Sequence, residues 1–321
     1  MSHPVTAVFP KNVLDRLPQV EARLQEQARS REPRLESWTA EPLAAGGKRI
    51  RPLLLLTAFD ACRPDADEAA WDGAMDAAVA LELIHTASLV HDDIMDEAAE
   101  RRGRPSTYAA HGRDGAILVG DYLFTQAFAI GARLPKAAMD ITADACRRLC
   151  EGQLRERRVQ EEGSTKREDY AAVIRDKTAV LLTAACGIGA IMAQADDEQV
   201  DALSQYGTAI GHAFQVLDDV LDVAGDPRWT GKPAGTDYVA GTHSSPYLHY
   251  MERGGELPAK RDAEDFPAVR DRLFETGAIA ASQMEASTYT QDALLRLEAL
   301  PPGPSRDALA GLAELLMERF Q

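Results

Sequence analysis

Apolar residues recur along most of the chain at intervals of three and four, the spacing that places them on one side of an α-helix. Strict alternation of apolar and polar residues, which is typical of a half-buried strand, is nearly absent. The pattern therefore predicts an all-α protein. The strongest predicted helices cover residues 71–97, 115–134, 139–160 and 199–223.

Glycine and proline residues fall between these patterns, where helices are expected to stop. Examples are Arg63-Pro64, Leu134-Pro135 and Pro301-Pro302. No Ser/Gly-rich linker or fixed-period repeat divides the chain, so we expect a single domain over residues 1–321. Residues 225–246, rich in Gly, Pro and Thr, form the longest predicted irregular stretch, and such loops often close over a binding site.

The 321 residues include 35 Lys and Arg and 51 Asp and Glu, a net charge of −16. This charge repels phosphate backbones and anionic lipid surfaces, so we expect no nucleic-acid partner and no membrane docking. The N-terminus has no apolar secretory segment, and the weakly polar stretch 180–193 is too short to span a bilayer. We therefore expect a cytoplasmic protein without a transmembrane segment. Its four cysteines contain no CxxC pair and are expected to be reduced.

Two acidic clusters, residues 92–96 and 218–222, both read DDxxD. On a helix, the first and last aspartates of each cluster share one face. A single DDxxD is commonly a solvated helix face, but both copies adjoin apolar runs. Carboxylates packed together beside apolar surface stay ionised only where a cation neutralises them. All-oxygen ligation of this kind suits Mg²⁺.

Basic residues gather at four places that suit a phosphate group: Lys48 and Arg51 in GGKRIRP, Arg101-Arg102 directly after the first acidic cluster, Lys177 before a threonine, and Lys232 between Gly and Pro. Glycine lets the backbone approach an anion, and arginine offers a bidentate fork to phosphate oxygens. A lone basic pair is usually a surface feature. Four such places beside two acidic clusters predict a magnesium and diphosphate site.

The motifs GGKRIRP, ELIHTASLVHDDIMD followed by ERRGRPS, KTA, FQVLDDVLD and GDPRWTGKPAG, in this order, resemble the trans-isoprenyl diphosphate synthases, or polyprenyl synthetases. The resemblance covers about residues 40–250 and leaves 251–321 as divergent C-terminal helices. It implies an all-α bundle with both aspartate motifs facing one central cavity, usually as a homodimer. It also implies head-to-tail elongation of an allylic diphosphate by isopentenyl diphosphate to an all-trans polyprenyl diphosphate.

The resemblance further implies a role for each matching residue. Three Mg²⁺ ions would be held by Asp92, Asp96 and Asp218, with Asp93, Asp219 and Asp222 in supporting contacts. The allylic diphosphate would be bound by Arg101, Lys177, Thr178, Gln215 and Lys232, and isopentenyl diphosphate by Lys48, Arg51, His85 and Arg102. The ions help the diphosphate leave, the isopentenyl double bond attacks the allylic cation, and the released pyrophosphate takes up the proton then lost.

Helical spacing supports two of these roles independently of the resemblance. His85 lies seven residues before Asp92, and Gln215 lies seven before Asp222, so each shares the face of its acidic cluster. The alternative to a substrate-binding role for His85 is a buried histidine that is hydrogen-bonded to the backbone. His91 points about 100° away from Asp92 and is expected to be structural.

Product length is expected to depend on the residues just before the first acidic cluster. Ala87 and Ser88 are small there, whereas in the family an aromatic residue blocks the tunnel that holds the growing chain. We therefore expect geranylgeranyl diphosphate or longer, with Phe124 or Phe128 closing the tunnel. A short-chain farnesyl product is the alternative, since the small residues also let two helices pack closely.

One loop departs from the family pattern. After Gly235-Thr236-Asp237 the family commonly continues with Gly-Lys-x-Thr-x-Pro, but residues 241–246 read GTHSSP and contain no lysine. The phosphate contact that this lysine makes in the family is therefore missing, which leaves Lys232 as the cation of the loop.

Three other functions would each explain part of the sequence pattern. A class I terpene cyclase also ionises a prenyl diphosphate at a DDxxD, but it has no use for GGKRIRP, Arg102 or a second DDxxD. A magnesium-dependent phosphohydrolase of the HD type would explain only His85 and His91-Asp92. A non-catalytic partner subunit of a heteromeric synthase usually loses aspartates, and all six are present here.

Overall fold

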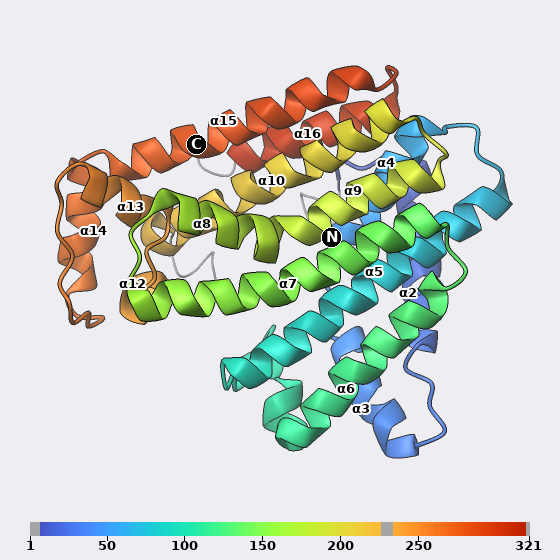
Figure 1. Ribbon diagram of the computed structural model, residues 1–321, viewed down its shortest axis with the longest axis horizontal. Helices are drawn as coiled ribbons and strands as arrows, with labels where there is room; N and C mark the ends of the chain where they lie inside the picture. Colours follow the sequence, from blue (N-terminus) through green and yellow to red (C-terminus); the bar gives the residue numbers. More distant parts are fainter. Residues whose placement is uncertain (1–6, 226–233, 319–321) are drawn as a thin grey trace. The chain divides into compact units, whose positions relative to one another are not determined.

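The computed structural model describes residues 7–225 and 234–318, and within them it is all-α apart from one two-stranded hairpin, as the sequence predicts (Figure 1). The elements are α1 Lys11–Leu14, α2 Leu17–Glu26, α3 Pro33–Ala44, α4 Ile50–Cys62, α5 Glu68–Met95, β1 Glu100–Arg101, β2 Arg104–Pro105, α6 Thr107–Gly131, α7 Lys136–Glu162, α8 Arg167–Val173, the π-helix η2 Ile174–Ala179, α9 Val180–Met192, α10 Asp197–Ala224, α12 Thr236–Ala240, α13 Ser245–Glu252, α14 Phe266–Glu275, α15 Ala278–Arg296, the 3₁₀ turn η3 Leu297–Ala299 and α16 Pro304–Glu318.

The chain forms two compact units, and the single domain expected from the sequence stays a prediction. Unit 1 comprises Met1–Cys146, Ala184–Ser204 and Ala299–Leu312, and unit 2 comprises Arg147–Thr183, Gln205–Glu298 and Ala313–Gln321.

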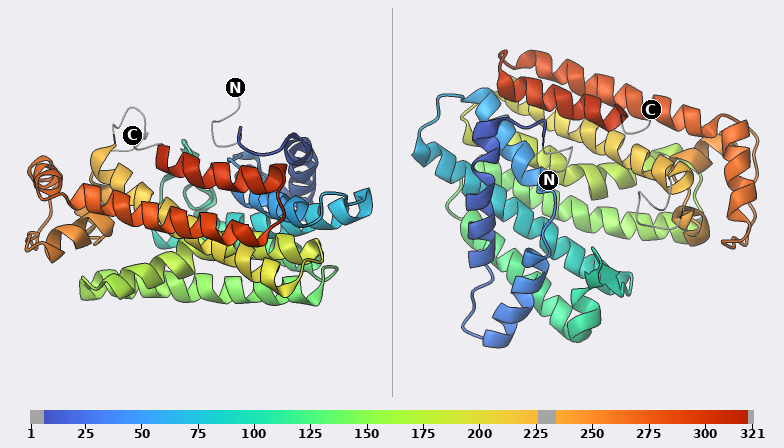
Figure 2. Two further views of the ribbon diagram at one scale, coloured as in Figure 1. Left: turned by 90° about the horizontal axis from the view of Figure 1, so that it is seen from above. Right: turned by 180° about the vertical axis from the view of Figure 1, so that it is seen from behind.

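The helix α5 forms the centre of unit 1, packed against α2, α4 and α6 (Figures 1 and 2). It begins at Asp67, whose side chain accepts a hydrogen bond from the Ala70 N–H over 2.9 Å, and it is apolar on nearly every side. By length and composition alone α5 could cross a membrane. However, 72% of its most apolar stretch is buried inside the protein, as expected for the core helix of a soluble protein.

Close packing of α5 against α6 depends on a glycine. The His91 ring of α5 lies over Gly120 of α6, where an added Cβ would be 2.1 Å from His91 Nε2. The ring also stands 5.8 Å from the Phe124 ring, centroid to centroid. His91 is therefore a packing residue at this crossing, consistent with its predicted structural role.

A cluster of aromatic residues forms the core at one end of unit 2. Tyr238 of α12 lies 5.9 Å from Phe266 of α14 and 6.3 Å from Tyr247 of α13, measured between ring centroids. The cluster joins α12, α13, α14 and the start of α15.

Residues 225–246 were expected to be irregular, but their described part contains the short helix α12, which Tyr238 anchors in this core.

Candidate active site

The first acidic cluster lies where α5 ends. Asp92 is in the last turn, and Asp96 is the C-cap, its N–H donating to the Asp92 carbonyl over 2.9 Å. Asp96 retains helical backbone angles, so the two side chains share one face, as the spacing predicted. Asp93 points elsewhere and is only 2% exposed.

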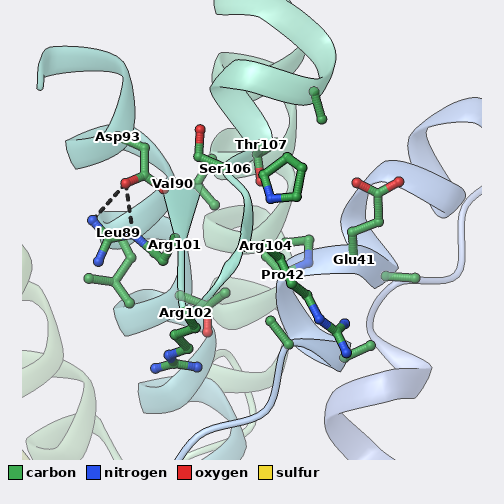
Figure 3. A pocket seen from close by; sticks show the side chains of 16 residues that line it. Glu41, Pro42, Leu89, Val90, Asp93, Arg101, Arg102, Arg104, Ser106 and Thr107 are labelled. Carbon is green, nitrogen blue, oxygen red and sulfur yellow. Dashed lines mark hydrogen bonds and ion pairs between the residues drawn. The ribbon is translucent and has the colours of Figure 1, made fainter. Parts of the chain in front are cut away.

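The hairpin β1–β2 presents two arginines beside this cluster. Its turn residues, Arg102 and Gly103, have φ angles of 54° and 71°, the left-handed pair that a type I′ turn requires. Asp93 accepts hydrogen bonds from Arg101 Nε at 2.7 Å and Nη2 at 2.6 Å (Figure 3). Asp93 thus fixes the hairpin to the end of α5 and leaves the other face of the cluster to Asp92 and Asp96.

Arg102 reaches back to the GGKRIRP segment. Its guanidinium donates a hydrogen bond to the Gly46 carbonyl, and a Cβ on Gly47 would lie 2.9 Å from Arg102 Nη1. Gly46 has a φ of 69°, a conformation that glycine adopts without strain. The two glycines therefore let Arg102 lie against the backbone next to Lys48, which brings together two residues predicted to bind the same diphosphate.

A buried ion network supports this segment. Arg49 binds Glu21 Oε1 at 2.5 Å and Glu82 Oε1 at 3.0 Å, and the Arg49 and Glu82 side chains are almost completely buried. Sequence reasoning did not single out Glu82, although it is the one acidic residue in the apolar run 77–91 of α5. In the described part of the chain, Glu82 Oε2 and Arg51 Nε are buried without a hydrogen-bond partner.

His85 lies among these positive charges. Burial lowers its pKa well below the usual value, and the charges of Arg51, Arg102, Arg101 and Arg49 lower it further. The imidazole is therefore neutral at pH 7, while its surroundings remain cationic. Such a set of fixed positive charges favours an anion such as a diphosphate.

The two residues predicted to set product length differ in orientation. Around the helix axis, Ser88 lies about 40° and Ala87 about 140° from the direction of Asp92. Ala87 is completely buried, and Ser88 is half-buried and donates to the His85 carbonyl over 2.8 Å. Phe124 and Phe128 stack on α6 with ring centroids 6.4 Å apart.

In unit 2, the π-helix η2 carries Lys177 and Thr178. Just before them, Asp176 accepts hydrogen bonds from Arg148 Nε and Arg175 Nε, each at 3.0 Å, and from Arg155. Burial would raise the pKa of Asp176, but the three arginines lower it to about 2. The ionised carboxylate thus fixes the wide turn that presents Lys177, a geometry often found at functional sites.

The second acidic cluster contains a buried carboxylate. Asp219 accepts hydrogen bonds from the Tyr170 hydroxyl at 2.5 Å, Gln215 Nε2 at 3.0 Å and the Ser245 N–H at 3.1 Å. Burial and the neighbouring Asp237 charge nevertheless raise the pKa of Asp219 to about 8. Neither Tyr170 nor Asp237 was identified from the sequence, because both are close to Asp219 only in the folded chain.

A cavity of about 270 Å³ joins this cluster to η2. Thr178 Oγ1 donates to Gln215 Oε1 over 2.8 Å, and Lys177 Nζ donates to Glu156. Lys177, Thr178, Gln215 and Asp219 all line the cavity. The structure thus brings together three residues that the resemblance assigned to the allylic diphosphate and Asp219, which it assigned to supporting the metal ions. It adds Glu156, which sequence reasoning missed.

Asp222 binds the turn that begins α12. Its carboxylate accepts hydrogen bonds from the Thr236 N–H and the Asp237 N–H, each at 3.1 Å, and from the Thr236 hydroxyl. Asp218, one turn earlier, is exposed. Lys232, predicted to bind the allylic diphosphate, lies outside the described residues.

The loop without the family lysine makes its polar contacts within unit 2. Thr242 accepts a hydrogen bond from Gln160 Nε2 at 3.0 Å. His243 Nδ1 lies 3.0 Å from the Ser164 carbonyl, and His243 Nε2 lies 2.6 Å from Arg261 Nη2. Burial and the Arg261 charge lower the pKa of His243, so this histidine is neutral at pH 7 and does not replace a lysine charge.

The described carboxylates do not form a site that protein ligands alone could complete around a metal ion. Residues 7–225 and 234–318 contain no cluster of three or more His, Cys, Asp or Glu that could hold an ion. Mg²⁺ usually binds through one or two carboxylates and completes its octahedron with water and substrate phosphate. All four cysteines have free thiols in the structure.

Comparison with protein families gives one match over most of the chain. Residues 32–264 match the family model "Polyprenyl synthetase". The chain is 38% identical to a short chain isoprenyl diphosphate synthase of Methanothermobacter thermautotrophicus, over 86% of this chain and 88% of the relative. It is 36% identical to a nonaprenyl diphosphate synthase of Mycobacterium tuberculosis, over 98% and 95%.

Solved structures agree with the sequence relatives. A polyprenyl synthase from Caulobacter crescentus, crystallised with calcium and isoprenyl diphosphate, matches with a TM-score of 0.89 and 30% identity, over 100% of this chain and 99% of that one. A decaprenyl diphosphate synthase from Rhodobacter capsulatus matches with a TM-score of 0.88 and 31% identity, over 99% and 100%.

Proposed function

The chain belongs to the polyprenyl synthetase family, and from this premise we propose that it is a prenyltransferase that condenses isopentenyl diphosphate head-to-tail with an allylic diphosphate. The proposal rests on one arrangement of side chains, which occurs in both units. Each unit has a DDxxD on a helix and a set of cationic or hydrogen-bonding side chains beside it. This combination suits a diphosphate that is bound together with metal ions.

In this reaction the protein acts by placing charges. Lys177, Thr178 and Gln215 would bind the allylic diphosphate, together with Arg101 and Lys232. Lys48, Arg51 and Arg102 would bind isopentenyl diphosphate, and the neutral His85 would add a hydrogen bond without a further charge. No side-chain nucleophile is needed, because the leaving diphosphate itself can accept the proton that the product cation loses.

Asp92, Asp96 and Asp218 would hold Mg²⁺, three ions in all, supported by Asp93, Asp219 and Asp222. When bound, the ions neutralise the charge that develops on the departing diphosphate. Asp219 fits this arrangement, since a carboxylate whose burial disfavours its own ionisation gains most from a nearby cation.

The proposed product is an all-trans polyprenyl diphosphate of geranylgeranyl length or longer. The relatives named above include short-chain and nonaprenyl synthases, so family membership alone does not select a length. The small side chains of Ala87 and Ser88 support the longer product. Farnesyl diphosphate is the alternative.

We further propose a cytoplasmic homodimer. One relative, 35% identical over 312 residues, is component 2 of a heptaprenyl diphosphate synthase from Geobacillus stearothermophilus, so a heteromeric assembly is the alternative. The presence of all six aspartates favours an active subunit over a non-catalytic partner.

The test is incubation of the pure protein with MgCl₂, isopentenyl diphosphate and, in turn, dimethylallyl, geranyl and farnesyl diphosphate. Products would be identified by mass. We expect elongation of at least one primer, and a loss of elongation in the Asp92→Ala and Asp218→Ala variants.

The matched control is Asp140→Ala, which removes an exposed aspartate that pairs with Lys136 on α7. It should elongate like the wild type. The proposal fails if no primer is elongated, or if the Asp92→Ala and Asp218→Ala variants elongate as well as the control.

A further inference from the structure

The hydrogen bonds of Asp219 continue beyond the second acidic cluster, towards the C-terminal helix α15. Asp219 Oδ2 accepts from two donors, the Tyr170 hydroxyl and the Ser245 N–H. Tyr170 belongs to α8, and Ser245 is the first residue of α13. The position of the Asp219 carboxylate therefore depends on how α8 and α13 are held.

One carboxylate of α15 binds both of these helices. Glu285 Oε2 accepts hydrogen bonds from Arg167 Nη1 of α8 and from Ser245 Oγ of α13, each over 2.9 Å. His249, one turn further along α13, has its Nε2 3.0 Å from the same oxygen. Glu285 thus fixes the two elements that donate to Asp219.

This network is largely shielded from water. The side chains of Glu285 and His249 are 17% and 14% exposed, and Ser245 is completely buried. Arg167 also donates two hydrogen bonds to Glu252, at 2.8 and 2.9 Å, which hold its guanidinium in place. Hydrogen bonds to charged groups are stronger where water is excluded, so the network holds α8 and α13 firmly at Asp219.

The other oxygen of Asp219 leads to the proposed diphosphate site. Asp219 Oδ1 accepts from Gln215 Nε2 over 3.0 Å, and Gln215 Oε1 accepts from Thr178 Oγ1 over 2.8 Å. The Gln215 amide is therefore held at both ends, and all three residues line the cavity of about 270 Å³. Gln215 uses one N–H on Asp219, which leaves the other N–H to donate to a phosphate oxygen. An amide turned the other way would present its oxygen to the anion and repel it.

We propose that Glu285 is a positioning residue for the allylic diphosphate. It acts through Ser245 and Asp219 on the Gln215 amide, and it is not among the residues that line the cavity. Glu285 lies outside residues 32–264, which match the family model, so family membership does not assign it this role. The inference rests on the proposed function and extends it to the C-terminal helices.

The test measures two KM values of the full-length protein in MgCl₂, one for geranyl diphosphate and one for isopentenyl diphosphate. Glu285→Ala removes the link to both helices. Ser245→Ala removes the hydroxyl that binds Glu285 and keeps the N–H that binds Asp219. Each should raise the KM for geranyl diphosphate about fivefold or more. The KM for isopentenyl diphosphate should change less than about twofold, because its proposed ligands lie in unit 1.

Two further variants separate positioning from a loss of folded protein. Glu285→Gln keeps an oxygen for the Ser245 hydroxyl, so it should raise the KM for geranyl diphosphate less than Glu285→Ala does. The double variant Ser245→Ala/Glu285→Ala should be no worse than either single variant, because both substitutions break the same link. The matched control is Asp292→Asn, which removes a carboxylate of α15 from an exposed pair with Arg296 and should keep both wild-type KM values.

A rise in the KM for geranyl diphosphate alone supports the proposal. The proposal is overturned if this KM stays within about twofold of the control in Ser245→Ala and in Glu285→Ala, or if both KM values rise together. It is also overturned if only kcat falls, since a smaller folded fraction lowers kcat and leaves KM unchanged. Should Glu285→Ala not fold, Ser245→Ala decides. In each of these cases the wild type still elongates its primer, whereas failure of the proposed function is seen as no elongation by the wild type.

Discussion

Buried carboxylates have different partners in this protein, and the partners decide their charge. Asp176 is surrounded by three arginines and stays ionised, whereas Asp219 receives neutral donors and has a raised pKa. The sequence contains both as ordinary aspartates. Only the fold reveals the difference, because the arginines that bind Asp176 include Arg148 and Arg155 from another helix.

Asp176→Asn should make the protein less stable at pH 5. It should also make the free energy of unfolding depend less on pH in the acidic range. The pKa of Asp176 is lowered to about 2 in the folded protein, against about 3.9 in an unfolded chain. The stabilisation is therefore complete above pH 4 and is lost as the pH falls towards 2. Because the arginines are partly exposed, we expect about 1 to 2 kcal/mol at pH 5.

Urea unfolding at several pH values between 5 and 3 measures this difference. Asp292→Asn removes a carboxylate from an exposed pair with Arg296 and serves as the control, with an expected loss below about 0.5 kcal/mol. A constant difference between wild type and Asp176→Asn across this range would contradict the assignment.

Ala87→Tyr should shorten the product, since it places a ring one turn before the first acidic cluster. The site is completely buried, so the ring also costs about 1 to 3 kcal/mol of stability. Ser88→Tyr places the ring on the side of α5 that is closer to the direction of Asp92. Products are compared by chromatography after removal of the diphosphate.

Ala87→Ser adds one oxygen and no ring, so it should leave the product length unchanged. If both tyrosine variants fold and make the wild-type distribution of products, the growing chain does not pass along this part of α5.

Among the elements, the long helices were predictable from the sequence, whereas the β1–β2 hairpin and the π-helix η2 were not. Periodicity placed α5, α6, α7 and α10 within a few residues of their ends, except that α6 begins at Thr107, well before residue 115. The segment before residue 115 contains Gly112, whose φ of 73° breaks the helical pattern. The β1–β2 hairpin and η2 depend on partners from other elements, which a periodic pattern does not contain.

Gly120→Ala should force α5 and α6 apart. The added methyl group would overlap the His91 ring, and we expect a loss of about 1 to 3 kcal/mol in the free energy of unfolding. Removal of the ring in the double variant His91→Ala/Gly120→Ala should recover part of the loss.

The double-mutant cycle is measured by urea unfolding. Additive effects of the two substitutions would show that His91 is not what excludes a side chain at position 120.

At the scale of the whole molecule, the negative net charge disfavours nucleic acid as a partner but does not exclude a small diphosphate. The six aspartates of the two DDxxD clusters account for six of the net −16 charges, and the rest of the chain carries −16 + 6 = −10. Three Mg²⁺ ions would offset the six carboxylates. An acidic protein can therefore bind a diphosphate locally, although its overall charge repels nucleic acid.

Mg²⁺ together with pyrophosphate should raise the melting temperature, because both bind the folded protein and not the unfolded chain. At 100 times the Kd, this linkage contributes about 2.7 kcal/mol. Differential scanning calorimetry measures the shift, and EDTA should abolish it. Asp92→Ala and Asp218→Ala should each reduce it. An equal shift from pyrophosphate in EDTA would show that the anion binds without a metal.

The carboxylate of Asp60 has a consequence for synthesis of the chain. Asp60 is 6% exposed and accepts hydrogen bonds from Asn12 Nδ2 at 2.9 Å, near the start of the chain, and from Ser305 Oγ at 2.5 Å. Ser305 follows Asp60 by 245 residues. On the ribosome, unit 1 can complete the polar contacts of this carboxylate only after residue 305 has emerged, so its final folding step waits until the segments of unit 2 that lie between residues 60 and 305 have been made.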